Sequence, residues 1–190
     1  MMLEILLVGV CHDFQWISPD FIRRLRPDAV EAYAQVRSRY EEWIRGCVRE
    51  FGPLLIFDEM NLPEGATRER LCDTGRLWVY MDIPEDVRRK FGLIAFRTTL
   101  EDLWISGVDD VRENYWRVVI ENMTAACRIS RVLAICGSAH LASCEERLRD
   151  AGHVVSQKDM FAEGWCDLSW HPDPLTREYG EKRKQMPSQG

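Results

Sequence analysis

The chain has 190 residues, of which 46% are hydrophobic and 29% are charged, so we expect one compact globular domain. Its 25 Lys and Arg against 31 Asp and Glu give a net charge of −6 at pH 7, and no long basic run occurs. Phosphate contacts supply most of the affinity of nucleic-acid-binding proteins, so this balance excludes nucleic acid as an expected partner. Small molecules, peptides and metal ions remain as candidate partners.

The first residues predict a buried strand rather than a membrane anchor. The apolar run at residues 3–10 is far shorter than the roughly 20 residues that span a bilayer, and Glu4 stands where a signal peptide would be apolar. The seven cysteines include no C-x-x-C pair, which argues against a zinc ribbon and a thioredoxin motif. We therefore expect no membrane partner and a reducing, cytoplasmic environment.

Short apolar runs alternate with amphipathic segments along the chain. The apolar runs predict strands at residues 4–10, 54–57, 77–81, 132–136 and from 154. The amphipathic segments predict helices at 28–51, 67–72, 84–91, 109–130 and 141–151, with 92–107 ambiguous. Asp28 is the expected N-cap of the first long helix, and Gly52-Pro53 is its expected stop. The alternation predicts an α/β fold with a mainly parallel central sheet flanked by helices.

We expect one domain over residues 1–171, with its cleft at the carboxyl ends of the strands. Residues 172–190 are polar, with charged residues at 182–184, and predict a flexible tail.

Among the seven tryptophans, Trp43 and Trp116 lie on predicted helices and are expected in the core. The long amphipathic helices would also permit a homodimer.

One pattern occurs twice, namely an apolar strand followed by Gly-x-x-His. The first copy is Gly9-Val10-Cys11-His12 and the second is Gly137-Ser138-Ala139-His140. Glycine allows a sharp turn, and the carboxyl ends of parallel strands form the ligand crevice of such a sheet. Both imidazoles are therefore expected in one cleft. The strand at 54–57 runs into Asp58-Glu59 at the same edge.

Two imidazoles and one carboxylate predict metal or acid–base chemistry. His12, Glu59 and His140 are a ligand set for a divalent metal such as manganese, cobalt or zinc. Without a metal they form an acid–base set that activates water. The alternatives are that each histidine is a structural hydrogen-bonding group and that Asp58-Glu59 is a solvated strand end.

The other candidate side chains carry weaker signals. Cys11 adjoins His12, which suggests a nucleophilic Cys/His pair, but adjacent side chains at a strand end point apart. Ser138 lies near His140 but outside any nucleophile-elbow pattern, so we do not expect a serine hydrolase. His171 is either a third histidine ligand or, as we expect, a surface residue, and His153 is expected to be structural.

These blocks resemble the superfamily that unites the erythromycin esterases, the TraB and TIKI proteins and the ChaN-like haem-uptake proteins. The resemblance rests on Leu7-Val8-Gly9-x-x-His12, on Glu59, on Arg112-Glu113-Asn114 and on residues 135–141 followed by 148 and 152–155. It implies an α/β core with hydrolytic chemistry, either metal-dependent peptide cleavage of the TIKI type or ester hydrolysis of the erythromycin esterase type. It also assigns His12, Glu59 and His140 to the site and Arg112 near it.

The function that follows is hydrolysis of a small ester, amide or peptide. Arg112 would clamp an oxyanion or a carboxylate with its planar guanidinium, and the alternative is a solvated residue at a helix start. Val10 stands where erythromycin esterases usually have Glu. That departure favours a second hypothesis, a non-catalytic domain of the same fold that binds a small molecule or a metal.

Overall fold

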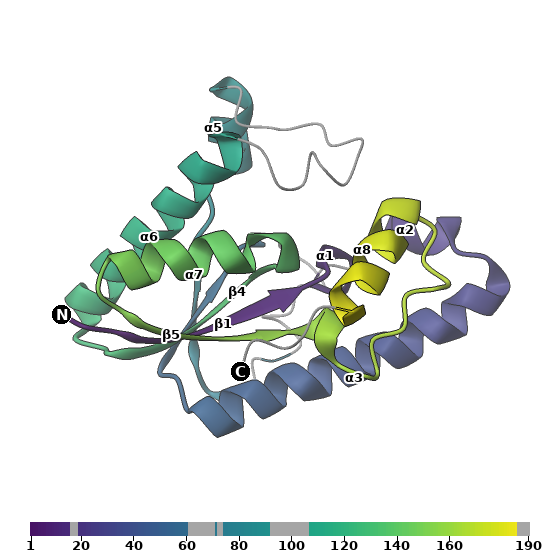
Figure 1. Cartoon of the computed structure of the whole chain (residues 1–190), viewed down its shortest axis with the longest axis horizontal. Coiled ribbons are helices and arrows are strands. Elements are labelled where there is room, and N and C mark those ends of the chain that lie inside the picture. The colour runs from purple at the N-terminus through teal and green to yellow at the C-terminus, as the bar shows by residue number, and fades with distance from the viewer. Residues whose placement is uncertain (16–18, 61–70, 72–73, 92–106, 186–190) are drawn as a thin grey trace.

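The computed structural model describes residues 1–15, 19–60, 71, 74–91 and 107–185. In these residues five parallel strands form one sheet in the order β3-β2-β4-β1-β5 (Figure 1). The strands are β1 (Glu4–Val10), β2 (Leu55–Asp58), β3 (Leu77–Tyr80), β4 (Arg131–Gly137) and β5 (Val154–Asp159). The predicted α/β fold is therefore confirmed. Residues 92–106 of the ambiguous segment and all but residue 71 of the helix expected at 67–72 fall outside the described residues, and residue 107 begins α6.

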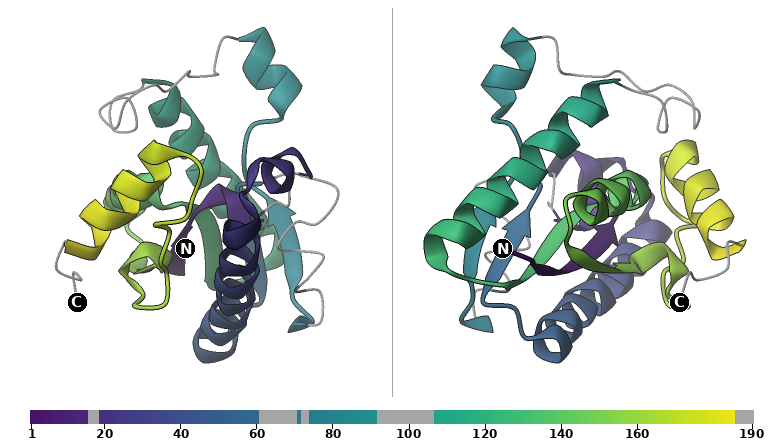
Figure 2. Two further views of the ribbon diagram at one scale, coloured as in Figure 1. Left: turned by 90° about the vertical axis from the view of Figure 1, so that its right-hand side faces the viewer. Right: turned by 60° about the vertical axis from the view of Figure 1, so that its left-hand side comes forward.

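Helices cover both faces of the sheet (Figure 2). They are α1 (His12–Gln15), α2 (Pro19–Arg24), α3 (Pro27–Phe51), α5 (Glu85–Lys90), α6 (Gly107–Cys127), α7 (Leu141–Asp150) and α8 (Pro174–Gln185), with the 3-10 turns η3 (Ser138–His140) and η4 (Met160–Ala162). Among the described residues, no helix is both long and apolar enough to cross a membrane.

The side chains of β1 show how the two layers meet the sheet. Leu6 and Val8 belong to the hydrophobic cluster under α3, whereas Ile5 and Leu7 belong to the cluster under α6 and α7. Successive strand residues point to opposite faces, and a parallel sheet covered on both faces buries all of them. This explains the continuous apolar runs of the sequence.

The ends of α3 show one wrong and one confirmed expectation. The helix begins at Pro27, and its N-cap is Arg26, which makes no side-chain capping bond. Asp28 therefore lies inside the first turn, because proline is suited to the first helical position. At the other end Gly52 has φ 64° and donates its N–H to the Val48 carbonyl, which is the predicted glycine stop.

The C-terminal segment differs from the predicted flexible tail. Residues Pro174–Gln185 form α8, and Tyr179 is only 6% exposed and meets the Phe161 ring edge-to-face. Arg183 also donates through Nε to Asp159 at 2.7 Å. The polar composition misled the prediction because only a narrow face of α8 is buried.

The contact between β1 and α7 generates a stability prediction. A β-carbon added to Gly9 would stand 2.7 Å from Leu141 Cγ and closer still to Cδ1. We expect Gly9→Ala to lower the free energy of unfolding by about 1–3 kcal/mol through overpacking, as measured by urea denaturation. As a control, Gly46→Ala in α3 has no atom within 4 Å of the new carbon and should raise it by about 0.5–1 kcal/mol. An unchanged Gly9→Ala would contradict this packing.

Candidate functional site

Three neighbouring strands carry the site at their carboxyl ends. His12 follows β1, Glu59 follows β2 and His140 follows β4, and β4 lies between the other two in the sheet. The Nε2 atom of His12 lies 3.7 Å from Glu59 Oε1, and that of His140 lies 4.0 Å from the same oxygen. The structure thus brings together the three side chains that the sequence placed at one edge.

His12 is held in one orientation by a short chain of amide contacts. Its Nδ1 lies 2.5 Å from Gln15 Oε1, and the Gln15 amide nitrogen donates to Asp58 Oδ1 at 3.1 Å. The amide oxygen of Gln15 is only an acceptor, so His12 Nδ1 carries a proton. The other ring nitrogen, Nε2, is the one that faces Glu59.

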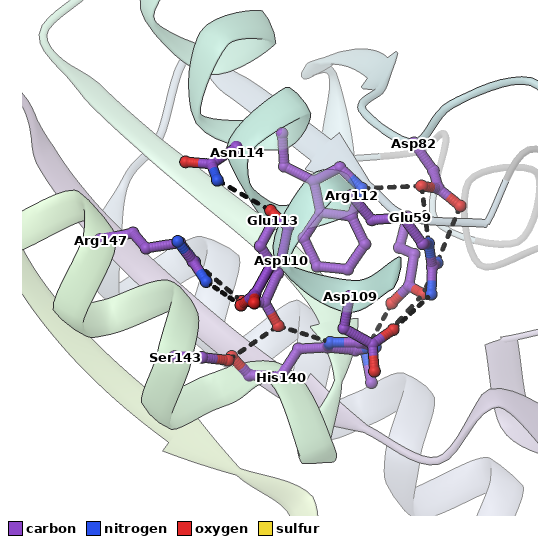
Figure 3. A network of polar contacts seen from close by, with 12 residues as sticks. Glu59, Asp82, Asp109, Asp110, Arg112, Glu113, Asn114, His140, Ser143 and Arg147 are labelled. Carbon is purple, nitrogen blue, oxygen red and sulfur yellow. Dashed lines mark hydrogen bonds and ion pairs between the residues drawn. The ribbon is translucent and has the colours of Figure 1, made fainter. Parts of the chain in front are cut away.

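His140 is held in the same way by a carboxylate (Figure 3). Its Nδ1 lies 2.8 Å from Glu113 Oε1, and Glu113 also accepts from Ser143 Oγ at 2.7 Å and from Arg147 Nε at 3.1 Å. Burial lowers the pKa of His140, but the hydrogen bond to Glu113 and the charge of Glu59 outweigh it and leave the pKa above its usual value.

Both oxygens of Glu59 are occupied by hydrogen bonds. Arg112 Nη2 donates to Oε1 at 2.5 Å, and the backbone N–H of Gly137 donates to Oε2 at 2.8 Å. Burial raises the pKa of Glu59, but the charges of the two histidines and of Arg112 hold it well below its usual range. Glu59 is 4% exposed, so the alternative of a solvated strand end is wrong.

Arg112 is buried against Trp116 and surrounded by carboxylates (Figure 3). Its Nε and Nη2 donate to the two oxygens of Asp82 at 3.1 and 2.8 Å, and Nη1 reaches Asp109 at 3.5 Å. The alternative of a solvated helix start is therefore wrong. All three guanidinium nitrogens contact carboxylates, so the geometry makes Arg112 a residue that positions Glu59 rather than a free clamp.

Gly137 allows the two imidazoles to approach each other. A β-carbon at this position would lie 2.7 Å from His12 Nε2 and 3.4 Å from His140 Cδ2. Any larger residue would therefore push His12 away from Glu59. The glycine of the second Gly-x-x-His turn thus leaves space for the histidine of the first.

Sequence reasoning missed three supporting residues, which are Gln15, Asp82 and Glu113. Two signals were present, because Glu113 stands in the Arg112-Glu113-Asn114 block and Gln15 lies three residues after His12. Asp82 follows β3 at the same sheet edge, but no spacing in the sequence links it to Arg112.

A second polar cluster joins Cys11, Asp13 and His171, whose ligand atoms lie within 4.8 Å of one another. His171 is 1% exposed, so the expectation of a surface residue is wrong. The N–H of Asp173 donates to His171 Nδ1 at 3.2 Å, and His171 Nε2 lies 3.0 Å from Asp13. Nε2 must then carry the ring proton. A cation bound at Nε2 would move that proton to Nδ1, where it would break the hydrogen bond from the Asp173 N–H. This cluster is satisfied without an ion.

The remaining candidates have ordinary partners. Ser138 Oγ donates to Asp159 at 2.8 Å. His153 accepts from the backbone N–H of Leu3 at 3.4 Å, a contact that fits a structural role.

A cavity of about 260 Å³ opens beside the two histidines. Its described lining residues are Val10, Cys11, His12, Gly137, Ser138, Ala139, His140, Phe161, Asp173, Leu175, Thr176 and Tyr179.

Comparison of the chain with protein-family models, with curated proteins and with solved structures finds no match. The resemblance to the erythromycin esterase, TraB and TIKI superfamily therefore stays a prediction.

Asp58 generates a prediction on pH. Its Oδ2 is buried without a partner, and burial raises the pKa of Asp58 to about 7, above the value of about 3.9 in unfolded chains. The protonated carboxyl therefore stabilises the fold at low pH, and this stability is lost as the pH rises through 7. In the wild type this titration lowers the free energy of unfolding by about 3 kcal/mol between about pH 5 and pH 8. Asp58→Asn, which has no such carboxyl, should lack this decrease. Parallel denaturation curves at the two pH values test this, and an unchanged slope would contradict it.

Glu113→Gln should lower the pKa of His140 by about 1–2, because the ring loses its charged partner. The measurement is an NMR titration of the His140 ring in both proteins. Ser143→Ala is the matched control, since it removes a neutral donor to the same Glu113 oxygen and to the His140 carbonyl and should not lower that pKa. Equal titration curves for Glu113→Gln and the wild type would refute the role of Glu113.

Proposed function

We propose that the protein is a hydrolase of small esters, amides or peptides with its reaction centre at His12, Glu59 and His140. One observation carries the proposal, namely the matched orientation of the two imidazoles. Each ring gives Nδ1 to an acceptor and turns Nε2 toward the same Glu59 oxygen. Neither Nε2 has a hydrogen-bond partner among the described residues, and either nitrogen can act as a metal ligand or exchange a proton.

The donor set fits a divalent cation. Imidazole nitrogen and carboxylate oxygen suit zinc, cobalt and manganese. Metal-binding histidines usually donate their second N–H to an acceptor, and Gln15 and Glu113 occupy those positions. An ion held by His12, Glu59 and His140 would lower the pKa of a bound water toward about 7 and polarise the substrate carbonyl.

The chain's own residues supply the remaining steps. Arg112 keeps Glu59 ionised and fixes its direction. Without an ion, the raised pKa of His140 and its contact with Glu113 support a proton at Nε2, which the ring can give to a leaving group. Before that transfer, His12 Nε2 would accept a proton from a water molecule as the water oxygen bonds to the substrate carbonyl carbon, and the bond to the leaving group breaks as His140 protonates it.

The second candidate function is a binding domain without catalysis. The 2.5 Å bond from Arg112 favours it, because this bond neutralises the Glu59 carboxylate without an ion. The two functions differ in turnover but share the cavity.

Metal content and turnover, measured together, separate the two candidate functions. Mass spectrometry on protein purified without chelator or His tag should show manganese, cobalt or zinc near one ion per chain, and His12→Ala/His140→Ala should lose it. His153→Gln is the matched control because its ring lies at the start of β5, and it should keep the ion. The double variant should also lose hydrolysis of a panel of small esters and peptides, with a melting temperature within a few degrees of the wild type.

The other outcomes are equally informative. Absence of metal after addition of each ion would reject the metal-dependent version. Hydrolysis that persists in the double variant would reject the site itself, and bound metal without turnover would favour the binding domain.

A further inference from the structure

The cavity beside the histidines has two unlike walls. The inner wall comes from the ends of β1 and β4 and carries His12 and His140. The outer wall comes from η4 and α8 and carries Phe161, Leu175 and Tyr179. A molecule in the cavity would therefore meet imidazoles on one side and apolar side chains on the other.

The described lining residues include no Lys or Arg. Their one carboxylate is Asp173, which caps α8 by accepting from the backbone N–H groups of Leu175 and Thr176 and from Thr176 Oγ1. Burial raises the pKa of Asp173, but these hydrogen bonds outweigh it and leave the pKa below its usual value. An anionic group placed against the apolar wall would meet this negative charge without a guanidinium or ammonium partner, since the imidazoles line the opposite wall.

The apolar wall is firmly attached to the rest of the fold. The rings of Phe161 and Tyr179 meet edge-to-face with centroids 5.0 Å apart. A β-carbon on Gly180 would lie 3.2 Å from the Phe161 ring, so α8 packs directly on η4. The ion pair of Arg183 with Asp159 ties the far end of α8 to β5. The outer wall is therefore a preformed surface rather than a loose cover.

The volume limits what the cavity accepts. An apolar cavity of about 150 Å³ is known to hold benzene, and this one has about 260 Å³. It therefore has room for a phenyl or branched alkyl group together with the atoms that link it to a carbonyl at the histidines.

We infer that this cavity is the specificity pocket of the reaction centre and that it selects an uncharged apolar group, aromatic or branched aliphatic, next to the scissile bond. This inference rests on the proposed function for the bond that is broken. The pocket itself is a binding property and is measured without turnover. Leu175 is an apolar lining residue in the first turn of α8, so a larger side chain at this position would fill part of the pocket.

The binding test uses two probes that a hydrolase does not cleave. We expect 3-phenylpropan-1-ol to bind the full chain at least tenfold more tightly than 4-(3-hydroxypropyl)benzoate, which carries its negative charge on the ring that faces the apolar wall, as measured by ligand-observed NMR with calorimetry. Leu175→Trp fills the pocket and should weaken binding of the alcohol at least tenfold. Val118→Trp is the matched control, because Val118 is 42% exposed on α6 and outside the lining. Melting curves establish that each variant is folded.

The turnover test compares p-nitrophenyl phenylacetate with p-nitrophenyl acetate. The ratio of their kcat/KM values should favour the phenylacetate at least tenfold and fall toward one in Leu175→Trp. If Leu175→Trp does not fold, Leu175→Asp and Thr176→Trp give the same comparison.

The two tests separate the pocket from the reaction. Selective binding without hydrolysis of either ester would support the pocket and reject the esterase form of the proposed function. Equal or tighter binding of the anion, or alcohol binding that Leu175→Trp does not affect, would reject the pocket even if both esters are cleaved.

Discussion

The ionised, buried carboxylate of Glu59 is the constraint on which the site depends. An unpaired buried charge costs several kcal/mol, and here it is offset by Arg112 and by the N–H of Gly137. Arg112 is itself buried and needs Asp82 as a bidentate partner. Charge compensation therefore joins β2, β4 and α6 to the residue that follows β3. The site cannot be built from two strands alone.

The order of the strands turns this constraint into a reaction centre. Because β4 lies between β1 and β2, the turn after β4 places Gly137 against both imidazoles. Each imidazole is held from behind, His12 by a glutamine and His140 by a glutamate. The Glu113 carboxylate favours the protonated form of His140. The two histidines thus have different partners at Nδ1, a neutral amide for His12 and a charged carboxylate for His140.

The sequence predicted the strands and the convergence of His12, Glu59 and His140, because apolar runs mark buried strands and glycine marks the turns after them. It did not predict the partners of these residues. Asp82 meets Arg112 only through the tertiary fold, 30 residues away in sequence. The same holds for His171, which is buried by a contact with Asp13 across 158 residues, and for α8, whose one buried face carries too few apolar residues to give a periodic signal.

The charge network lies apart from the apolar wall of the cavity. Arg112 pairs with Glu59 and is held by Asp82, and none of these three residues lines the cavity, whereas the first turn of α8 donates N–H groups to Asp173. The charge beside the apolar wall is therefore a capped carboxylate, which does not attract an anionic group. Recognition then falls to the shape and apolar character of the wall formed by Phe161 and Leu175. The polar half of the site is left free for bond cleavage, since none of its groups is needed to hold a charged substrate.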